Sequence, residues 1–225
     1  FRANVIDYFV ESYRDGLTPN PCIACNDHIK FGSLLQHAER LDAPLVATGH
    51  YARVAYDPDR GRYRLSRAAV PEKDQSYVLF NLTQEQLACA RFPLGELSKS
   101  SVRETARALG FTNAEKPDSQ DVCFVRDRNK NGFLRRELKI ADDPGPVTDT
   151  QGNVLGAHQG LLGYTIGQRE GLGVAVGTPL YVVAIDQPNN RLIVGSRQEL
   201  LSRALIAERV NWVSMAAPAG PVRVA

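Results

Sequence analysis

The chain has 225 residues, of which 43% are hydrophobic and 23% are charged, an ordinary composition for a globular protein with a core of its own. Its formal net charge of +2 favours no class of partner. No apolar run approaches the roughly 18 residues of a membrane span, and no apolar segment follows basic residues at the start. We therefore expect neither a membrane protein nor a signal peptide. Four cysteines are also too few for a disulfide scaffold at this length.

The chain starts at Phe1 without an initiator methionine, which predicts that the sequence is a fragment of a longer one. Residues 2–15 mix apolar and charged side chains at the spacing of a helix. Residues 18–26, TPNPCIACN, contain two prolines within four residues, which predict a stiff, extended turn. A second helical pattern covers about 27–42, so Cys25 is expected at or just before a helix N-terminus, where the thiolate form is favoured.

A short apolar run at residues 45–47 ends in Thr48-Gly49-His50 and predicts a buried parallel strand. Ligands of open α/β sheets bind outside the carboxyl ends of such strands. Gly49 would let a nucleotide approach the backbone, and His50 would face the same crevice, although a histidine near a loop is more often structural. An exposed hairpin is expected around residues 62–66.

The middle of the chain carries several helix signals. Residues 73–77, KDQSY, could start a helix with Asp74 as its cap. Two capping boxes are predicted, formed by Thr83 with Gln86 and by Ser101 with Glu104. The second of these helices should stop at Gly110, because glycine commonly ends a helix. Cys89 has apolar neighbours within the first helix, so we interpret it as a small core residue.

Residues 122–125, VCFV, predict a buried strand that would carry Cys123 back to the sheet edge. The segment 126–139 then holds six basic residues against two acidic ones. Such a cluster fits either a contact with phosphates or a solvated helix face. From Gly145 onwards the pattern is one of short strands and turns, with a hairpin predicted at 181–186 and 191–195, so this part should be mostly β.

The spacing Cys22-x-x-Cys25 allows three kinds of chemistry. A structural zinc site would draw its four ligands from these two cysteines, Cys123 and either His28 or His50. A thioredoxin-type redox pair normally follows a strand, whereas here a proline-rich loop precedes the motif. Sulfur transfer would need one cysteine to carry a terminal sulfur and another to resolve it. The spacing alone does not decide among the three.

Six motifs in a fixed order are more specific than the cysteine pair. They are TPNPCIACNDHIKF at 18–31, ATGHY at 47–51, KDQSY at 73–77, FPLGEL at 92–97, DSQDVCF at 118–124 and YTIGQREGLG at 164–173. In this order they resemble the bacterial tRNA-specific 2-thiouridylases, ATP-dependent enzymes that thiolate the wobble uridine (position 34) of certain tRNAs. The resemblance covers nearly the whole chain, from about Phe9 to Trp212.

The resemblance implies an α/β fold with three parts. The first, 1–130, would be a partial adenine-nucleotide alpha-hydrolase-like (PP-loop ATPase) layer, with a helical excursion near 92–111 that belongs to the central domain. The second, 131–175, would be a small central α+β domain that binds tRNA, and 176–225 would start a C-terminal β-barrel. The family's Ser-Gly-Gly-x-Asp-Ser pyrophosphate loop is absent from this sequence. The resemblance therefore implies the interior of the enzyme, inactive on its own.

The same resemblance implies roles for individual residues in a cytoplasmic enzyme without a membrane partner. Cys25 would be the nucleophile and Cys123 the persulfide intermediate, and the two would form a disulfide when the thiolated base departs. Asn20, Pro21 and Cys22 would line the pocket of the target base. Gly49 would contact ATP, which is used with Mg²⁺. The residues implied in binding the anticodon stem-loop of tRNA are His50, Lys73, Asp74, Gln75, Arg126, Arg128, Arg135 and Arg136.

The sulfur would come from a sulfur-relay protein or a cysteine desulfurase. One alternative replaces the persulfide by an iron–sulfur cluster ligated by Cys22, Cys25 and Cys123. Another alternative, from a different class of protein, is a zinc-stapled RNA-binding module without catalysis.

Overall fold

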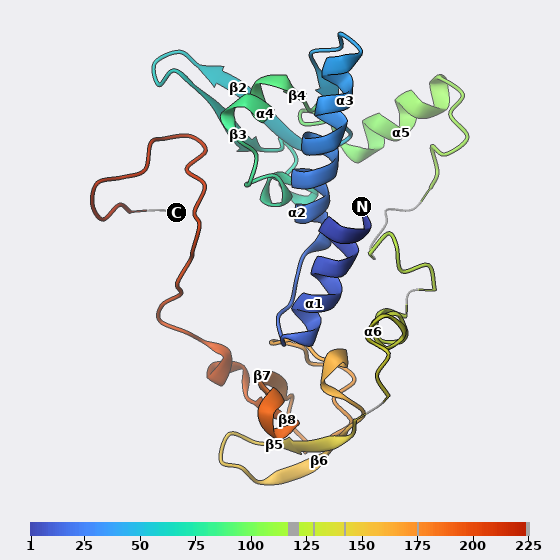
Figure 1. Ribbon diagram of the computed structural model, residues 1–225, viewed down its shortest axis with the longest axis vertical. Helices are drawn as coiled ribbons and strands as arrows, with labels where there is room; N and C mark the ends of the chain where they lie inside the picture. The colour runs from blue at the N-terminus through green and yellow to red at the C-terminus, as the bar shows by residue number, and fades with distance from the viewer. Residues whose placement is uncertain (117–121, 128, 142, 175, 224–225) are drawn as a thin grey trace. The chain divides into compact units, whose positions relative to one another are not determined.

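The computed structural model describes residues 1–116, 122–127, 129–141, 143–174 and 176–223 (Figure 1). The chain divides into two compact units. The first unit comprises Phe1, Pro21–Gln120 and Ala207–Ala225, and the second comprises Arg2–Asn20 and Asp121–Ile206. Each unit has a hydrophobic core of its own and is described by itself.

The first unit opens with one helical rod, which Figure 1 shows running through α2 and α3. It consists of α2 (Pro21–Cys25), the π-helix η2 (Asn26–Ser33) and α3 (Leu34–Arg40). The helix begins at Pro21, so the prediction that Cys25 lies at or just before the helix start was wrong by about one turn. The physical reason is that proline is well suited to the first helical position, where its missing N–H has no partner to lose.

A small parallel pair of strands follows the rod, β1 (Val46–Ala47) beside β4 (Ala90–Arg91). The crossover between them contains two 3-10 turns, η3 (Pro71–Lys73) and η4 (Ser76–Val78), and the helix α4 (Gln84–Cys89). The capping box of Thr83 and Gln86 is present as predicted, with each side chain bonded to the backbone of the other residue. The parallel pairing of β1 and β4 confirms the strand predicted at 45–47, but only Val46 is buried there, whereas Leu45 and Ala47 are exposed. Cys89 ends α4 and is half-buried rather than fully enclosed.

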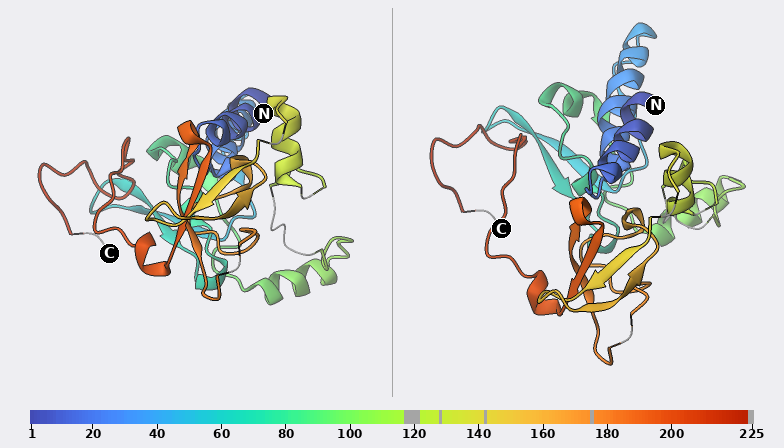
Figure 2. Two further views of the ribbon diagram at one scale, coloured as in Figure 1. Left: turned by 90° about the horizontal axis from the view of Figure 1, so that it is seen from below. Right: turned by 60° about the horizontal axis from the view of Figure 1, so that its bottom comes forward.

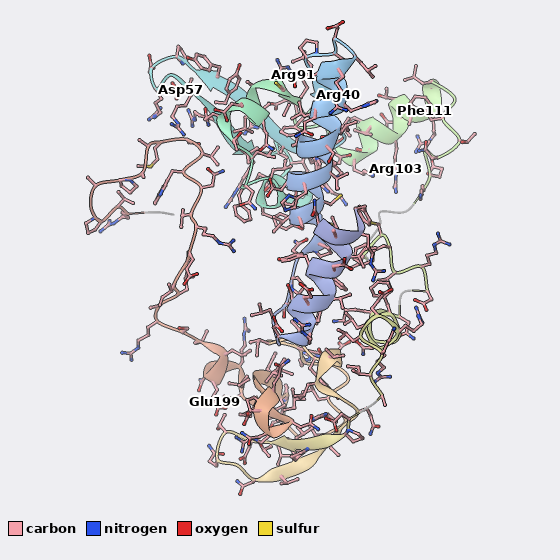
Figure 3. All side chains as sticks on the ribbon, in the orientation of Figure 1. Arg40, Asp57, Arg91, Arg103, Phe111 and Glu199 are labelled. Atoms are coloured by element: carbon pink, nitrogen blue, oxygen red, sulfur yellow. The ribbon has the colours of Figure 1, made fainter. Side chains whose placement is uncertain are left out.

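The predicted hairpin is formed by β2 (Ala52–Asp57) and β3 (Arg62–Arg67), which pair antiparallel. One face carries Val54, Tyr63 and Leu65, which pack against the core of the first unit. Asp57, which is labelled in Figure 3, ends β2, and its carboxylate accepts a hydrogen bond of 2.7 Å from Arg60. This contact lowers the pKa of the carboxyl group. The hairpin is thus held by its inner apolar face and by an ion pair at its turn.

Helix α5 (Lys99–Ala108) is capped by Ser98, whose hydroxyl accepts from the backbone N–H of Ser101. The predicted capping box of Ser101 with Glu104 was therefore wrong. The helix begins three residues earlier, because Ser98 already supplies the acceptor that the first turn requires. The predicted stop is confirmed, since Gly110 follows the helix with φ of +72°.

The second unit contains the π-helix η1 (Arg2–Asp7), α1 (Tyr8–Arg14) and α6 (Lys130–Leu138). The buried side chains of Phe9 and Leu134 join α1 to α6. Residues 122–125 form a turn, so the strand predicted there was wrong. Their apolar side chains are accommodated by helices instead, as Phe124 packs edge-on against Phe9 with ring centroids 5.4 Å apart.

The second unit also contains a four-stranded sheet, whose strands are drawn in yellow to orange in Figure 2. They are β5 (Gly145–Thr148), β6 (Val154–His158), β7 (Tyr181–Asp186) and β8 (Arg191–Gly195), and 3-10 turns lie at Leu161–Gly163, Gln187–Asn189 and Arg197–Leu200. The order in the sheet is β6-β5-β8-β7, and only β5 and β8 are parallel. The predicted hairpin of β7 and β8 is confirmed. Among the residues that the structure describes, these strands form an open sheet rather than a closed barrel.

The last described stretch, 207–223, belongs to the first unit. The amide of Asn211 donates to the carbonyl oxygens of Phe80 and Leu82, over 2.8 and 3.0 Å. Gln84 donates to the carbonyl oxygen of Val213 over 2.9 Å, and the Val213 side chain packs on the core. Within the described part of the chain, no helix is both long and apolar enough to span a bilayer.

Candidate functional site

The cysteine pair lies near the beginning of the helical rod, with Cys22 in its first turn and Cys25 about one turn after Pro21. Cys22 is exposed and Cys25 is half-buried, and residues three apart lie on the same side of a helix. Pro21 is buried at the helix start. Asn20, which precedes it and is half-buried, is assigned to the second unit. Asn20, Pro21 and Cys22, which were predicted to line the pocket of the target base, thus lie where the chain enters the helical rod. Their role in that pocket stays a prediction.

Asn26 fixes the helix directly after Cys25. Its side chain is only 1% exposed, and its amide nitrogen donates to the carbonyl oxygen of Val78 over 2.9 Å. The Oδ1 atom of the same side chain is buried without a hydrogen-bond partner. A buried amide with one bonded end anchors the helix while leaving one acceptor available inside the unit.

The carboxyl end of β1 carries the second group of predicted residues. His50 is only 7% exposed, and its ring packs edge-on against Phe92 with centroids 5.9 Å apart. Its Nδ1 lies 2.8 Å from Oγ1 of Thr48, and its Nε2 lies 3.4 Å from Nζ of Lys30. Burial, with a smaller effect of the Lys30 charge, lowers the pKa of His50 to about 4. The ring is therefore neutral at pH 7.

Gly49, between these residues, is exposed. A Cβ atom added there would meet only Cδ1 of Leu94, at an ordinary contact distance of 3.6 Å. The chain itself thus does not require glycine at this position. The predicted contact of Gly49 with a nucleotide remains a prediction, and so does the predicted contact of His50 with tRNA.

The loop 73–77 is held by its own side chains. Burial would raise the pKa of Asp74, but hydrogen bonds from the Ala68 N–H and from Ser76 outweigh this effect and lower it. Gln75 binds Tyr51 twice, because its N–H donates to the Tyr51 carbonyl and its Oε1 accepts from the Tyr51 N–H. The polar motif at 73–77 therefore has a structural role, and its predicted contact with tRNA is untested.

The second unit presents Cys123 on an exposed turn. Of the predicted basic residues, Arg126 and Arg136 are exposed, and Arg136 lies 3.6 Å from Asp127. Arg135 is half-buried and donates to the carbonyl oxygen of Gln159 over 3.1 Å. Arg128 lies outside the described residues. The basic run is thus a mixture of exposed charge and internal contacts.

Cys25 belongs to the first unit and Cys123 to the second. None of the four cysteines, all of which are described, forms a disulfide. The described residues contain no group of three histidine, cysteine, aspartate or glutamate side chains placed to hold a metal ion.

Sequence reasoning did not identify Lys30. It lies in the motif at 18–31, but nothing in its local pattern shows that the buried His50, which follows β1, will accept a hydrogen bond from its ammonium group. The one local signal was its position between two apolar residues, in the triplet Ile-Lys-Phe.

Two family models match the chain. The model described as tRNA methyl transferase HUP domain matches residues 1–127, and that described as tRNA methyl transferase PRC-barrel domain matches residues 131–196. A nucleotide-binding α/β domain followed by a barrel-type domain is the fold class that the sequence predicted. The domain boundaries drawn from the sequence remain a prediction.

Curated proteins match over nearly the whole chain. The chain is 52% identical over 215 residues to tRNA-specific 2-thiouridylase MnmA 1 of Thermoanaerobacter pseudethanolicus, covering 96% of this chain and 59% of that protein. It is 45% identical over 224 residues to tRNA-specific 2-thiouridylase MnmA of Clostridioides difficile, covering 100% and 62%. The protein of the same name from Heliobacterium modesticaldum is 49% identical over 227 residues, with 100% and 58% covered. The chain thus spans about three fifths of the length of these relatives.

Proposed function

Because the chain belongs to the family of the tRNA-specific 2-thiouridylases, we propose that it takes part in thiolating a uridine of tRNA. The observation that carries the proposal is the position of Cys25. Its half-buried thiol lies one turn after the start of the helical rod at Pro21, and the next turn of that rod brings Lys30 to the carboxyl end of β1. This arrangement combines a nucleophile with the sheet edge at which α/β proteins bind nucleotides.

The first step proposed is activation of the base by ATP. The C2 carbonyl of uracil is a poor electrophile, so its oxygen attacks the α-phosphorus of ATP and pyrophosphate leaves. The C2 position then carries AMP as a good leaving group. Gly49 would contact the nucleotide, while Asn20, Pro21 and Cys22 would surround a uridine that has swung out of its stack.

The second step proposed is sulfur transfer. The terminal sulfur of a persulfide on Cys123 attacks C2, the C2–O bond breaks and AMP leaves. The Cys25 thiolate then attacks Sγ of Cys123, so that the thiolated base departs and a disulfide joins the two cysteines. A thiol reductant must return two electrons to this disulfide. A sulfur-relay protein or a cysteine desulfurase must deliver the next sulfur.

Mg²⁺ would accompany the ATP, because at such sites its ligands are mainly nucleotide phosphates and water, with one or two carboxylates from the protein. The described residues contain no group of three histidine, cysteine, aspartate or glutamate side chains placed to hold a metal ion, and the proposed cluster ligands Cys25 and Cys123 belong to different units, so the iron–sulfur and zinc alternatives are tested by experiment. Iron and absorbance measurements on anaerobically purified protein test the cluster alternative directly. We further propose a cytoplasmic enzyme with tRNA contacts at His50, at 73–75 and along the basic run at Arg126, Arg128, Arg135 and Arg136.

The test uses protein expressed from its complete gene. Cys25→Ser and Cys123→Ser should each abolish thiolation, measured by mass spectrometry of digested tRNA, while tRNA binding in a filter assay survives. Cys89→Ser is the matched control, because Cys89 is half-buried at the end of α4 and has no part in the proposed chemistry. Thiolation that persists in either of the first two variants would refute the assignment.

A further inference from the structure

A linear array of three polar side chains joins the helical rod to the carboxyl end of β1. Nζ of Lys30 lies 3.4 Å from Nε2 of His50, and Nδ1 of His50 lies 2.8 Å from Oγ1 of Thr48. An ammonium group can only donate hydrogen bonds, so Nε2 of His50 accepts and Nδ1 carries the proton that points to Thr48. The tautomer of His50 is thereby fixed by its two partners.

The positive charge of Lys30 has no counter-charge in this array. His50 is neutral at pH 7, and no carboxylate of the described residues lies within the 4.0 Å of an ion pair from Nζ of Lys30. Other charged side chains of the same unit do form ion pairs, since the Asp57 carboxylate pairs with both Arg60 and Arg64. A half-buried cation that is held in place without a carboxylate is suited to bind an anion from outside the chain.

The place of the array in the fold indicates which anion. Lys30 follows Cys25 by five residues, which is one hydrogen-bonded turn of the π-helix η2. Thr48 and His50 follow β1, whose partner β4 is parallel, and the exposed Gly49 lies between them. Phosphates of nucleotides bind at this edge of open α/β sheets. The array therefore presents a cation where a nucleotide would present its phosphates.

We propose that Lys30 binds a phosphate group of the nucleotide substrate, and that His50 and Thr48 position its ammonium group. This inference rests on the proposed function only in taking ATP as that substrate. Lys30 then holds the phosphate beside the helix turn that carries Cys25. His50 acts through Lys30 as a positioning residue, because its two ring nitrogens lie against Lys30 and Thr48.

The test compares ATP with adenosine, which lacks phosphate, by calorimetric titration of protein from the complete gene. Lys30→Gln should weaken ATP binding at least about tenfold, as expected for losing a hydrogen bond to a charged group, and leave adenosine binding unchanged. Lys116→Gln removes the same charge from an exposed position after α5 and should leave both affinities unchanged. His50→Leu should weaken ATP binding, and His50→Gln, which keeps an acceptor, should restore part of it.

Three outcomes would overturn the inference. They are ATP binding that is undetectable in the wild-type protein, ATP affinity that is unchanged in Lys30→Gln, and an equal loss of ATP and adenosine affinity in that variant. A filter assay with tRNA distinguishes the phosphates of ATP from those of the RNA backbone. Weaker tRNA binding of Lys30→Gln with unchanged ATP binding would assign Lys30 to the RNA backbone instead. Phosphate-dependent ATP binding in a wild-type protein that does not thiolate tRNA would refute the proposed function and leave this inference standing.

Discussion

The amide nitrogen of Asn26 donates to the carbonyl oxygen of Val78 over 2.9 Å and so ties the residue after Cys25 to the loop that follows the KDQSY motif. Both partners are buried, at 1% and 6% exposure. Two motifs that are some fifty residues apart in the chain are thus joined inside the first unit. The geometry of the cysteine turn depends on this contact as well as on the helix itself.

Asn26→Leu should destabilise the first unit. The substitution leaves the Val78 carbonyl buried without a donor, which costs about 1–3 kcal/mol. The measurement is the free energy of unfolding in urea at pH 7. Asn113→Leu, at an exposed position after α5, is the control and should change stability little. Equal stability of the two variants would show that the Asn26 contact does not hold the helix.

His50 should make the protein less stable in acid. Burial lowers its pKa from the ordinary value of 6.5 to about 4 in the folded protein, so as the pH falls the unfolded chain takes up a proton at a higher pH than the folded protein does. The contribution of His50 to the free energy of unfolding is therefore fully present above pH 6.5 and is lost as the pH falls toward 4, by about 3 kcal/mol in all. Below pH 4 the protonated ring would also face the Lys30 ammonium group.

Unfolding in urea at pH 7 and pH 4.5 measures this effect. His50→Gln should lose much of the difference in stability between the two pH values that the wild-type protein shows. His37→Gln, in an exposed position on α3, should keep it. If His50→Gln shows the full wild-type difference, other groups are responsible for the acid sensitivity.

Gly95 is required by a close approach of two backbones. A Cβ atom added there would lie 2.0 Å from the carbonyl oxygen of Ala52, which cannot move without disturbing β2. Gly95→Ala should therefore cost about 1–3 kcal/mol of stability, the usual range for overpacking. Gly220→Ala is the control, since its added Cβ meets nothing within 4 Å. A thermal melt of both variants decides, and a wild-type melting temperature for Gly95→Ala would contradict the geometry.

Sequence reasoning succeeded where a structure is fixed by neighbouring residues. The capping box of Thr83 and Gln86, the stop at Gly110 and the hairpin of β7 and β8 each depend on signals within a few positions. Helical and strand periodicity, together with glycine and capping residues, encode such features locally.

It failed where contacts between distant residues decide. The apolar run 122–125 has the composition of a strand, yet the half-buried Phe124 packs against Phe9 from a helix more than a hundred residues away, and the segment forms a turn. Lys30 was missed for the same reason, since its partner His50 lies on another element. Tertiary packing overrides local propensity in both cases.

The exposed arginines of the basic run should contribute to tRNA binding through charge alone. Arg126 and Arg136 are exposed, whereas Arg135 also supports the Gln159 carbonyl, so reversing Arg135 would disturb packing as well. Arg126→Glu combined with Arg136→Glu should weaken tRNA binding and make the dependence of log K on log salt less steep by about one unit per lost phosphate contact. Arg40→Glu, an exposed arginine of α3 labelled in Figure 3, is the matched control in the first unit and should leave the slope unchanged. Filter binding over a range of salt concentrations measures both, and a slope unaltered by the double reversal would assign the run to a solvated helix face.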